Sequence, residues 1–306
     1  MGFSSSIEII LNAASGPSDG EETRRKVADS FQLGKADGHI HMPENGEDIS
    51  TLARKAAQSD CKTIVAGGGD GTISAIAEEI IGTDKLLGIL PLGTLNHFAK
   101  DLNIPADIDA AAQIILAEHS AKVDVGEVNG RIFVNNSSLG LYPDVVRGRE
   151  HRQRLGYGKW ISLVRSAFKV LQRHPLIDVR LNVDGEEITT RTPFIFIGNN
   201  EYEMEGFNIG GRSRLDDGNL SLYMTTRTGR FALFRLAVRA LVGNLGQAKD
   251  FVSLTTSQVS IRTRHKHVRV AMDGEVTMMQ SPLNYRIRPG ALTVLVPDAT
   301  NFETPN

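Results

Sequence analysis

A glycine-rich segment early in the chain has the residue types that hold phosphate groups. Residues 67–72 read Gly-Gly-Gly-Asp-Gly-Thr, between an apolar run and a stretch with helical periodicity. Glycines let backbone N–H groups approach a polyphosphate closely, and the N-terminus of a following helix adds partial positive charge. Asp70 would repel a bare phosphate, so its presence suggests a Mg²⁺ bridge or a contact with the attacking group. The alternative is a tight strand-to-helix turn, which needs fewer glycines and no aspartate.

Two further polar loops follow apolar runs in the same part of the chain. One contains Gly93, Thr94 and Asn96, which can approach phosphates, hydrogen-bond their oxygens or cap the next helix. The other begins at Asn12, after the first apolar run. Ligands of parallel sheets bind at the carboxyl ends of the strands, so we expect these loops and the glycine-rich segment to form one nucleotide cleft.

Acidic residues later in the chain could also do chemistry. Asp217 lies in a Leu-Asp-Asp-Gly-Asn segment that fits a turn and a metal site equally well. Glu275 follows Asp273 and Gly274, which taken alone predict a hairpin turn. Asp124, on an expected strand, either lines the cleft or is solvated. These residues need a second domain that places them opposite the glycine-rich segment.

The elements that position these residues change type along the chain. Residues 1–120 alternate short apolar runs with polar stretches of helical period, which predicts an α/β domain with a parallel sheet covered on both faces. Residues 121–298 contain short strands with Asn-Gly and Asp-Gly turns, which predict a mostly antiparallel β-sandwich with helical insertions at about 158–172 and 230–242. Residues 299–306 form a tail that we expect to return to the first domain.

Individual elements follow from the same patterns. The expected helices lie near 20–33, 47–59, 73–81 and 107–118. The expected strands are 7–11, 39–41, 63–66, 87–90, 123–128, 131–134, 177–183, 193–198, 219–225, 258–263, 267–272 and 292–296.

The composition is that of an ordinary soluble enzyme. Of the 306 residues, 41% are hydrophobic and 23% charged, and the net charge of −2 gives no global reason to expect a nucleic-acid partner. The single cysteine, Cys61, excludes an internal disulfide and fits a reducing compartment. We find no signal peptide, no apolar run of about 20 residues and no histidine pair with zinc spacing. We therefore expect a cytoplasmic protein whose membrane contact is peripheral.

The glycine-rich segment, residues 91–102 (PLGTLNHFAKDL) and the first loop together resemble the catalytic domain shared by diacylglycerol kinases, sphingosine kinases and bacterial lipid kinases. The resemblance covers nearly the whole chain and implies a two-domain fold like that of NAD kinases and diacylglycerol kinases, with ATP and Mg²⁺ as cofactors. It departs from the family at Ala13, where a proline is usual, and at Met42, where bacterial members often have a threonine. The residues that it places at the nucleotide are Asn12, Gly67, Gly68, Gly69, Asp70, Gly71, Thr72, Ile73, Ser74, Thr94 and Asn96.

The resemblance also assigns roles to the acidic residues. The family carries an Asp-Gly-Glu motif whose glutamate is the proton acceptor, and Glu275 matches it; Asp70 is the second catalytic candidate. In bacterial relatives an aspartate holds a structural Mg²⁺ with two backbone carbonyls, which here implies Asp217 with the carbonyls of Arg214 and Asn219. The expected reaction is transfer of the γ-phosphoryl group of ATP to a lipid hydroxyl, as in diacylglycerol.

Partners and competing functions complete the prediction. Residues 147–174 contain eight Lys or Arg and one acid, which indicates either a solvated helix face or contact with an anionic membrane. The expected partner is thus a lipid acceptor at a membrane surface. We expect no nucleic-acid partner, and the sequence does not decide between a monomer and a homodimer. One alternative is an NAD kinase, although we find no second Thr/Gly-rich nucleotide motif in residues 120–200. The other is a catalytically silent protein that binds lipid or nucleotide.

Overall fold

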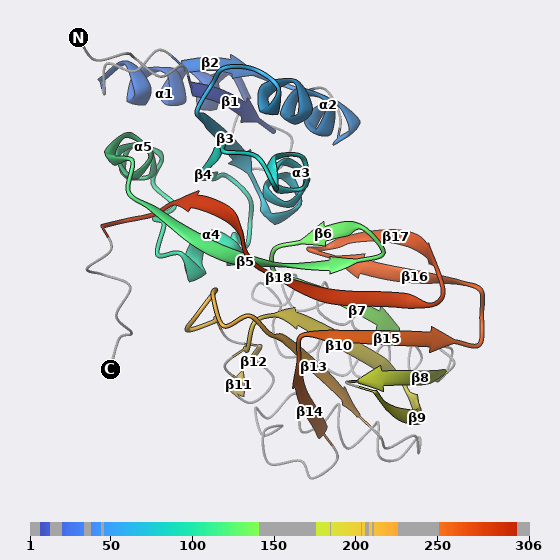
Figure 1. The fold of residues 1–306 in the computed structure, drawn as a ribbon. Coiled ribbons are helices and arrows are strands. Elements are labelled where there is room, and N and C mark those ends of the chain that lie inside the picture. Colours follow the sequence, from blue (N-terminus) through green and yellow to red (C-terminus); the bar gives the residue numbers. More distant parts are fainter. Residues whose placement is uncertain are drawn as a thin grey trace, which may run out of the picture.

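A parallel sheet with helices on both faces forms the first part of the chain in the computed structural model (Figure 1). The structure describes residues 7–12, 20–33, 38–43, 46–140, 176–183, 185–202, 204–205, 208–209, 211–225 and 251–298. The parallel strands lie in the order β2-β1-β3-β4, with bounds β1 (Ile7–Leu11), β2 (Gly38–His41), β3 (Thr63–Gly68) and β4 (Leu86–Pro91). The helices are α1 (Gly20–Leu33), α2 (Gly46–Ala57), α3 (Asp70–Ile80), α4 (His97–Asp101) and α5 (Ile108–Ala117).

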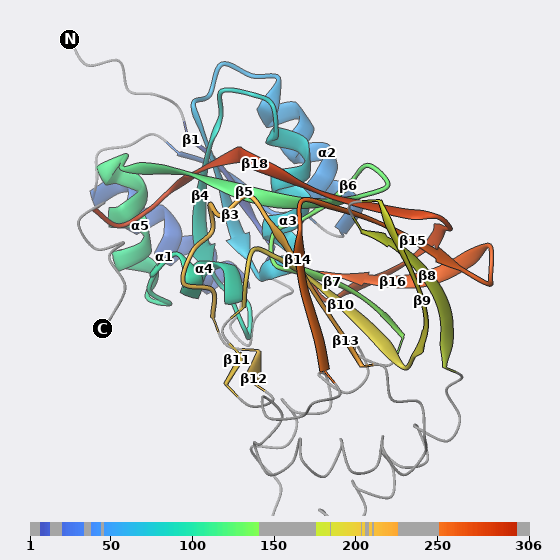
Figure 2. The ribbon, with the colours of Figure 1, turned by 60° about the horizontal axis from the view of Figure 1, so that its bottom comes forward.

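Burial explains why this sheet forms where it does. Every residue of β3 is buried, as expected for a central parallel strand that is covered on both faces. Helix α1 packs against α5 and α2 packs against α3, and the two pairs lie on opposite sides of the sheet (Figures 1 and 2). Helix α5 begins after Asp107, whose carboxylate accepts a 3.0 Å hydrogen bond from the Ala110 N–H.

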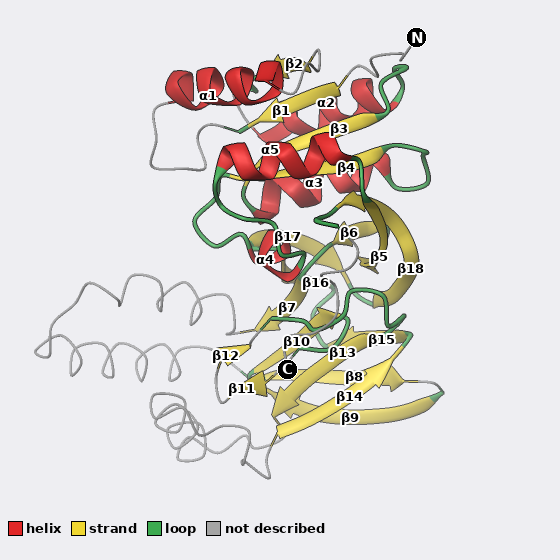
Figure 3. Ribbon diagram, turned by 90° about the vertical axis from the view of Figure 1, so that its left-hand side faces the viewer, coloured by secondary structure: helices red, strands yellow, loops and turns green. Residues whose placement is uncertain are grey.

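Antiparallel strands form the second part of the chain, at the opposite end of the molecule from helices α1, α2, α3 and α5 (Figure 3). One sheet continues the parallel sheet beyond β4 through β18 (Leu283–Leu295), β15 (Gln258–Thr263), β8 (Ile177–Val183) and β9 (Glu186–Thr192), with β5 (Ser120–Val128) paired to β18 and β6 (Arg131–Phe133) to β5. The facing sheet has the order β14 (Phe251–Thr256), β13 (Leu220–Thr225), β10 (Phe194–Asn199), β7 (Asn136–Gly140), β16 (His267–Met272) and β17 (Glu275–Gln280). A short separate pair consists of β11 (Met204–Glu205) and β12 (Asn208–Ile209).

Strand β18 belongs to both parts of the molecule. Near its C-terminal end it pairs in parallel with β4, Val294 opposite Leu87, and Leu292, Val294, Leu295 and the following Val296 lie in the first hydrophobic core. Its N-terminal half contributes Leu283, Tyr285 and Ile287 to the second core, between the two sheets of the sandwich. Strand β5 follows it in antiparallel pairing along most of its length (Figure 1). One continuous strand therefore joins the two cores.

The fold class predicted from the sequence is confirmed: an α/β domain with a parallel sheet precedes a mostly antiparallel β-sandwich. The four expected helices are present within a few residues of their expected ends. The sequence patterns predicted no bounds for α4, β7, β9, β11, β12, β14, β17 and the first part of β18. Strand β7 reads Asn-Ser-Ser-Leu-Gly, and its small serines are buried because it lies between β10 and β16. The insertions expected at 158–172 and 230–242 and the tail 299–306 lie outside the described residues.

Candidate active site

The loops that follow β1 and β3 are joined by hydrogen bonds at the carboxyl edge of the parallel sheet. The Asn12 N–H donates to the carbonyl of Gly67 at 2.7 Å, and the Asn12 side-chain amide donates to the Thr72 hydroxyl at 3.0 Å. The loop after β4 is tied to the same place, because the Leu92 N–H donates to the carbonyl of Gly68 at 3.1 Å. The structure thus brings together the three loops that the sequence placed around one cleft.

Two glycines allow the loops after β3 and β4 to touch. A Cβ on Gly93 would lie 2.4 Å from the Cα of Gly69, so a side chain at position 93 would push the loops apart. Asn96, in the left-handed region at φ 51°, fixes the shape of its own loop by donating to the carbonyls of Pro91 at 3.0 Å and Gly93 at 2.8 Å. Thr94 is exposed. Asn96 therefore supports the loop, while Thr94 is accessible to a ligand.

The first turn of α3 supplies the phosphate-binding geometry. Gly69 is the N-cap in an extended conformation and has no side chain to cover the helix end. The first hydrogen bond inside the helix runs from the Ile73 N–H to the Gly69 carbonyl at 3.1 Å, so the preceding N–H groups have no helical acceptor. The Ile73 side chain is fully buried, so only its backbone could face a ligand. Helix N-termini of this kind attract anions through free N–H groups and the helix dipole.

Asp70 connects helix α3 to helix α4. One carboxylate oxygen accepts from the His97 N–H at 3.1 Å, and the other accepts from the Phe98 N–H at 3.0 Å and the Asn135 side-chain amide at 3.0 Å. Asp70 therefore caps α4 from the first position of α3, a role that the local sequence could not reveal. Three of the roughly four acceptor positions of the carboxylate are used in this way.

The Asp273-Gly274 turn joins β16 to β17 and is fastened to α3. Both residues have positive φ, 46° and 89°, as the tightest hairpin turns require. The partly buried Asp273 carboxylate accepts from the Ser74 hydroxyl at 2.5 Å and from the N–H groups of residues 134–136 at 2.8, 2.9 and 3.0 Å. Burial raises the pKa of Asp273 to about 6, and these four donors oppose the shift. Asp273, the first residue of this turn, is thus a fixed anchor.

Glu275 comes directly after this anchored turn and lies beside the glycine-rich loop. A Cβ on Gly71 would be 2.9 Å from the Oε1 atom of Glu275, so the carboxylate reaches the first turn of α3. The side chain is exposed and accessible to a ligand. The fold therefore brings a carboxylate from the second part of the chain next to the expected phosphate position.

A buried arginine lies beneath the site. The Arg212 side chain is 0% exposed and pairs with Asp101 at 2.8 Å. Its guanidinium also lies 5.9 and 5.3 Å from the ring centres of Phe98 and Tyr202. The remaining hydrogen bonds go to the carbonyls of Val134 (2.7 Å) and Asn199 (3.0 Å) and to the side-chain oxygen of Asn135 (2.7 Å).

Arg212 orients a side chain that contacts Asp70. It binds the oxygen of the Asn135 amide, and the nitrogen of the same amide donates to Asp70. This chain of contacts runs from Asp101 in α4 back to the start of α3. Sequence analysis did not single out Arg212, Asp101 or Asn135, since one sequence gives no signal for isolated polar residues that meet only in the fold.

The residues predicted as metal ligands lie together in the loop before β13. The Asp217 carboxylate is 3.1 Å from Nε of Arg214, and the carbonyl of Asn219 accepts from the Asn200 N–H at 2.9 Å. In the part of the chain that the structure describes, no three His, Cys, Asp or Glu side chains converge as a metal cluster. A carboxylate and carbonyls suit Mg²⁺, but the guanidinium would first have to leave Asp217.

Asp124 lies next to this loop rather than in solvent. Its carboxylate is buried and accepts from the Gly218 N–H at 2.7 Å and the Gly290 N–H at 2.8 Å. It therefore holds the loop against the irregular point where β18 crosses between the two cores.

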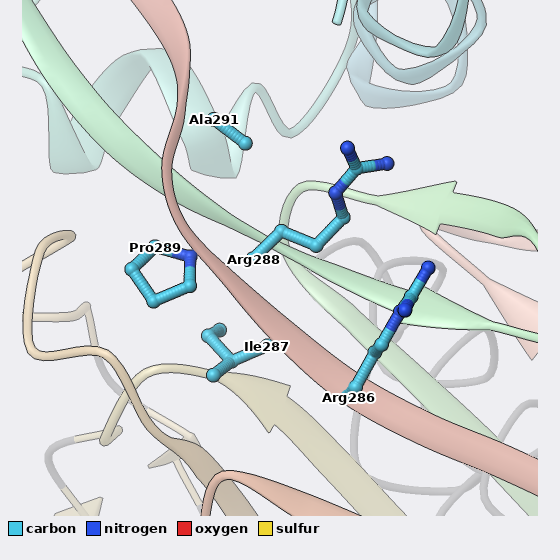
Figure 4. A pocket seen from close by; sticks show the side chains of 5 residues that line it. All are labelled: Arg286, Ile287, Arg288, Pro289 and Ala291. Carbon is cyan, nitrogen blue, oxygen red and sulfur yellow. The ribbon is translucent and has the colours of Figure 1, made fainter. Parts of the chain in front are cut away.

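A hollow on β18 is lined by none of the predicted site residues. It has a volume of about 370 Å³ and is lined by Arg286, Ile287, Arg288, Pro289 and Ala291. Figure 4 shows Arg286 and Arg288 projecting to the same side of the strand. Both approach the buried Glu127, at 2.7 and 3.5 Å, so one carboxylate already partly neutralises them.

Comparison with known proteins agrees with this arrangement. Residues 6–128 match the diacylglycerol kinase catalytic domain, and residues 145–296 match the YegS C-terminal NAD kinase beta sandwich-like domain. The chain belongs to the diacylglycerol kinase catalytic-domain family. The three phosphate-side loops lie in the first match and Glu275 lies in the second, so the resemblance inferred from the sequence is confirmed, and membership supports a phosphotransferase.

Two curated relatives are named diacylglycerol kinase. A diacylglycerol kinase of Staphylococcus haemolyticus (strain JCSC1435) is 28% identical over 222 residues, which cover 72% of this chain and 67% of the relative. One from Staphylococcus aureus (strain MRSA252) is 29% identical over 226 residues, with coverages of 72% and 70%.

Solved structures support the fold. A diacylglycerol kinase structure from Bacillus anthracis str. Sterne aligns with a TM-score of 0.70 at 22% identity, over 96% of this chain and 98% of that one. Yeast NADH kinase complexed with NADH aligns with a TM-score of 0.59 at 12% identity, over 97% and 85% of the two chains. At these identities the two structures show a shared architecture.

Two sequence-based expectations fall partly or wholly outside this description. The basic segment 147–174 and Ala13 are not among the described residues. Met42 follows β2 and is 38% exposed. In the described portion of the chain, no helix combines the length and apolar character needed to cross a bilayer.

Proposed function

We propose that this protein is an ATP- and Mg²⁺-dependent lipid kinase that phosphorylates the hydroxyl group of a diacylglycerol-like lipid. The observation that carries the proposal is the position of the Glu275 carboxylate beside Gly71, at the N-terminus of α3. A carboxylate there can act on an acceptor hydroxyl next to the phosphates of a bound nucleotide. The staphylococcal relatives named diacylglycerol kinase support a lipid acceptor.

The donor side of the reaction rests on the three loops of the first domain. The free N–H groups of the first turn of α3 would bind the phosphate oxygens of ATP, and Thr94 would contact them from the loop after β4. Asn12 and Asn96 hold these loops in shape. Mg²⁺, when it accompanies the nucleotide, neutralises charge on the phosphates, and oxygen ligands near the start of α3 suit it.

The acceptor side rests on Glu275. The carboxylate takes the proton of the lipid hydroxyl as its oxygen attacks the γ-phosphorus, and the bond from that phosphorus to the bridging oxygen of ADP breaks. The anchored Asp273 turn keeps the base at the phosphate loop, which supplies the positioning on which phosphoryl transfer depends. The acceptor would be presented at a membrane surface, to which the protein binds peripherally.

The test uses purified protein, Mg²⁺, ATP labelled at the γ position, and a mixture of total membrane lipid with NAD. We expect label in lipid, and we expect Glu275→Gln to lower turnover by about 10²-fold or more while ATP affinity stays within about two-fold. Glu186→Gln, an exposed change on β9, is the matched control and should keep full turnover.

Three outcomes would contradict parts of the proposal. Label in NAD rather than lipid would favour the NADH-kinase-like activity that the shared fold allows. Nucleotide or lipid binding without any labelled product would indicate a catalytically silent protein. Substantial turnover by Glu275→Gln would remove Glu275 from the role of base.

A further inference from the structure

The edge strand β17 carries two exposed apolar side chains. Val276 is 47% exposed and Met278 is 60% exposed; only Met42, at 38%, joins them among the large hydrophobic residues that are exposed in the described ranges. Side chains alternate along a strand, so both lie on the face opposite Met279, which packs in the second core. Exposed apolar side chains on an edge strand mark a surface that meets another partner.

A basic turn lies next to this apolar pair. Residues 262–269, which end β15 and begin β16, read Arg-Thr-Arg-His-Lys-His-Val-Arg and include no acid. All four of their cations are exposed: Arg262, Arg264, Lys266 and Arg269. Arg262 also lies directly opposite Arg180 of β8, an arrangement of like charges that destabilises a sheet. Within the described residues neither arginine has an ion-pair partner, because the nearby Asp178 is paired with Arg191.

Strand register joins the apolar and basic groups into one surface. Met278 lies opposite Arg269, so these two side chains share the outer face of the hairpin. The turn is held at the far end of the same hairpin, where the Ser281 N–H donates to the Lys266 carbonyl at 2.9 Å. We refer to Arg264, Lys266, Arg269, Val276 and Met278 as the hairpin surface.

We propose that the hairpin surface docks on a bilayer of anionic phospholipid. Cations close to an anionic leaflet are attracted to it, and apolar side chains beside them can enter the interface between headgroups and acyl chains. A single-stranded nucleic acid would also attract the cations, but it requires aromatic platforms for its bases, and the hairpin surface has none. The combination of positive charge with Val276 and Met278 therefore fits a lipid surface best.

The hairpin surface lies partly on β17, the strand that begins with the proposed base Glu275. Val276 is the residue after Glu275, and Met278 lies three residues beyond Glu275, about 10 Å along the strand. By the same alternation Glu275 lies on the other face of β17, so a bilayer on this surface would lie against the hairpin that carries the proposed base. The inference rests on the proposed lipid kinase function for its purpose, whereas the docking itself requires no turnover.

The experiment measures sedimentation of the full-length protein with vesicles of phosphatidylcholine, alone or mixed with phosphatidylglycerol. We expect binding only to the mixed vesicles. Replacing Arg264, Lys266 and Arg269 by Gln should weaken it roughly 100-fold, since each cation near the surface contributes about five-fold. Met278→Ser should weaken it several-fold without any change in charge.

The matched control removes three charges elsewhere. Arg24, Arg25 and Lys55 are exposed cations of α1 and α2, and their replacement by Gln should leave binding within about three-fold of the wild type. The triple hairpin variant should keep its thermal transition and its turnover on acceptor dispersed in detergent. If it does not fold, Lys266→Gln and Met278→Ser as single changes test the same surface.

The outcomes separate docking from the proposed function. Absence of wild-type binding to anionic vesicles, equal losses in the hairpin and control variants, or a hairpin-dependent preference for single-stranded RNA would each overturn the inference. Docking by a protein that phosphorylates no lipid would defeat the proposed function and leave the docking surface standing. Turnover in detergent without vesicle binding would support the proposed function and overturn the docking surface.

Discussion

At the scale of single residues, Arg212 is a charged side chain that the fold buries completely. Its guanidinium is fully buried and paired with Asp101, so Arg212→Met would leave the Asp101 carboxylate buried without its partner. We expect a loss of about 3–5 kcal/mol in the free energy of unfolding, measured by urea denaturation. Arg214→Met is the matched control, because that arginine is 61% exposed and its ion pair is screened by solvent. Similar losses for both variants would show that the buried network does not matter for stability.

Asp273 gives the protein a pH dependence with a definite sign. Its pKa is raised in the folded protein to about 6, above the ordinary value of 3.8, chiefly by burial. The protonated form therefore stabilises the fold below pH 4, and this contribution is lost as the pH rises through 6. Asp273→Asn lacks the titration. The difference in unfolding free energy between wild type and variant should fall by about 2 kcal/mol between pH 4 and pH 7. A difference that grows with pH would mean that the four donors outweigh burial.

Residue types and spacing predicted part of the candidate site. The glycine-rich loop and Glu275 were recognisable because a glycine run and an Asp-Gly-Glu motif each consist of adjacent residues. The partners of Asp70 were not, since they lie 27, 28 and 65 residues away and bind it through backbone or a lone amide. For the same reason Asp273 could be predicted as a turn residue but not as an anchor on Ser74.

At the scale of elements, the loops after β3 and β4 depend on a contact between backbones. Gly93→Ala would place a Cβ 2.4 Å from the Cα of Gly69, whereas a Cβ on Gly69 would meet the Cα of Gly93 at 3.4 Å, an ordinary contact. We expect Gly93→Ala to destabilise the protein by about 1–3 kcal/mol and to weaken nucleotide binding. Gly69→Ala should cost clearly less stability in the same thermal unfolding assay. If the two variants are equally stable, the close approach of these loops is not a constraint.

Elements with strong periodicity were predicted better than those defined by their neighbours. The parallel strands were predicted from short apolar runs, and α3 and α5 from helical period. Strand β7 is recognisable only in its place between β10 and β16, where small polar side chains fit. The length of β18 was also missed: residues 283–288 alternate apolar and polar side chains as a half-buried strand does, but 289–290 are Pro-Gly, which reads locally as a turn and separates them from 292–296.

At the scale of the whole molecule, β18 predicts that the two cores unfold together. Ile76 lies fully buried in the first core and Leu222 in the second. Replacing either by Ala should lower the unfolding free energy by about 2–5 kcal/mol. Because one strand is built into both cores, each variant should show a single shifted transition by circular dichroism. Hydrogen exchange in β3 and in β10 should report the same loss of unfolding free energy. Two separate transitions would show that the two cores unfold independently.

The hydrogen bond from Ser74 to Asp273 has a consequence for the timing of catalysis. It fastens the hairpin that carries Glu275 to the same helix that would receive the phosphates. A hinge between the two parts of the molecule therefore could not open without breaking this bond, while the three backbone bonds from residues 134–136 hold Asp273 in place within the second part. The base and the phosphate loop consequently behave as one preassembled body. The entropy of orienting them is lost once, during folding, and not at each turnover, so the lipid is left as the principal moving part.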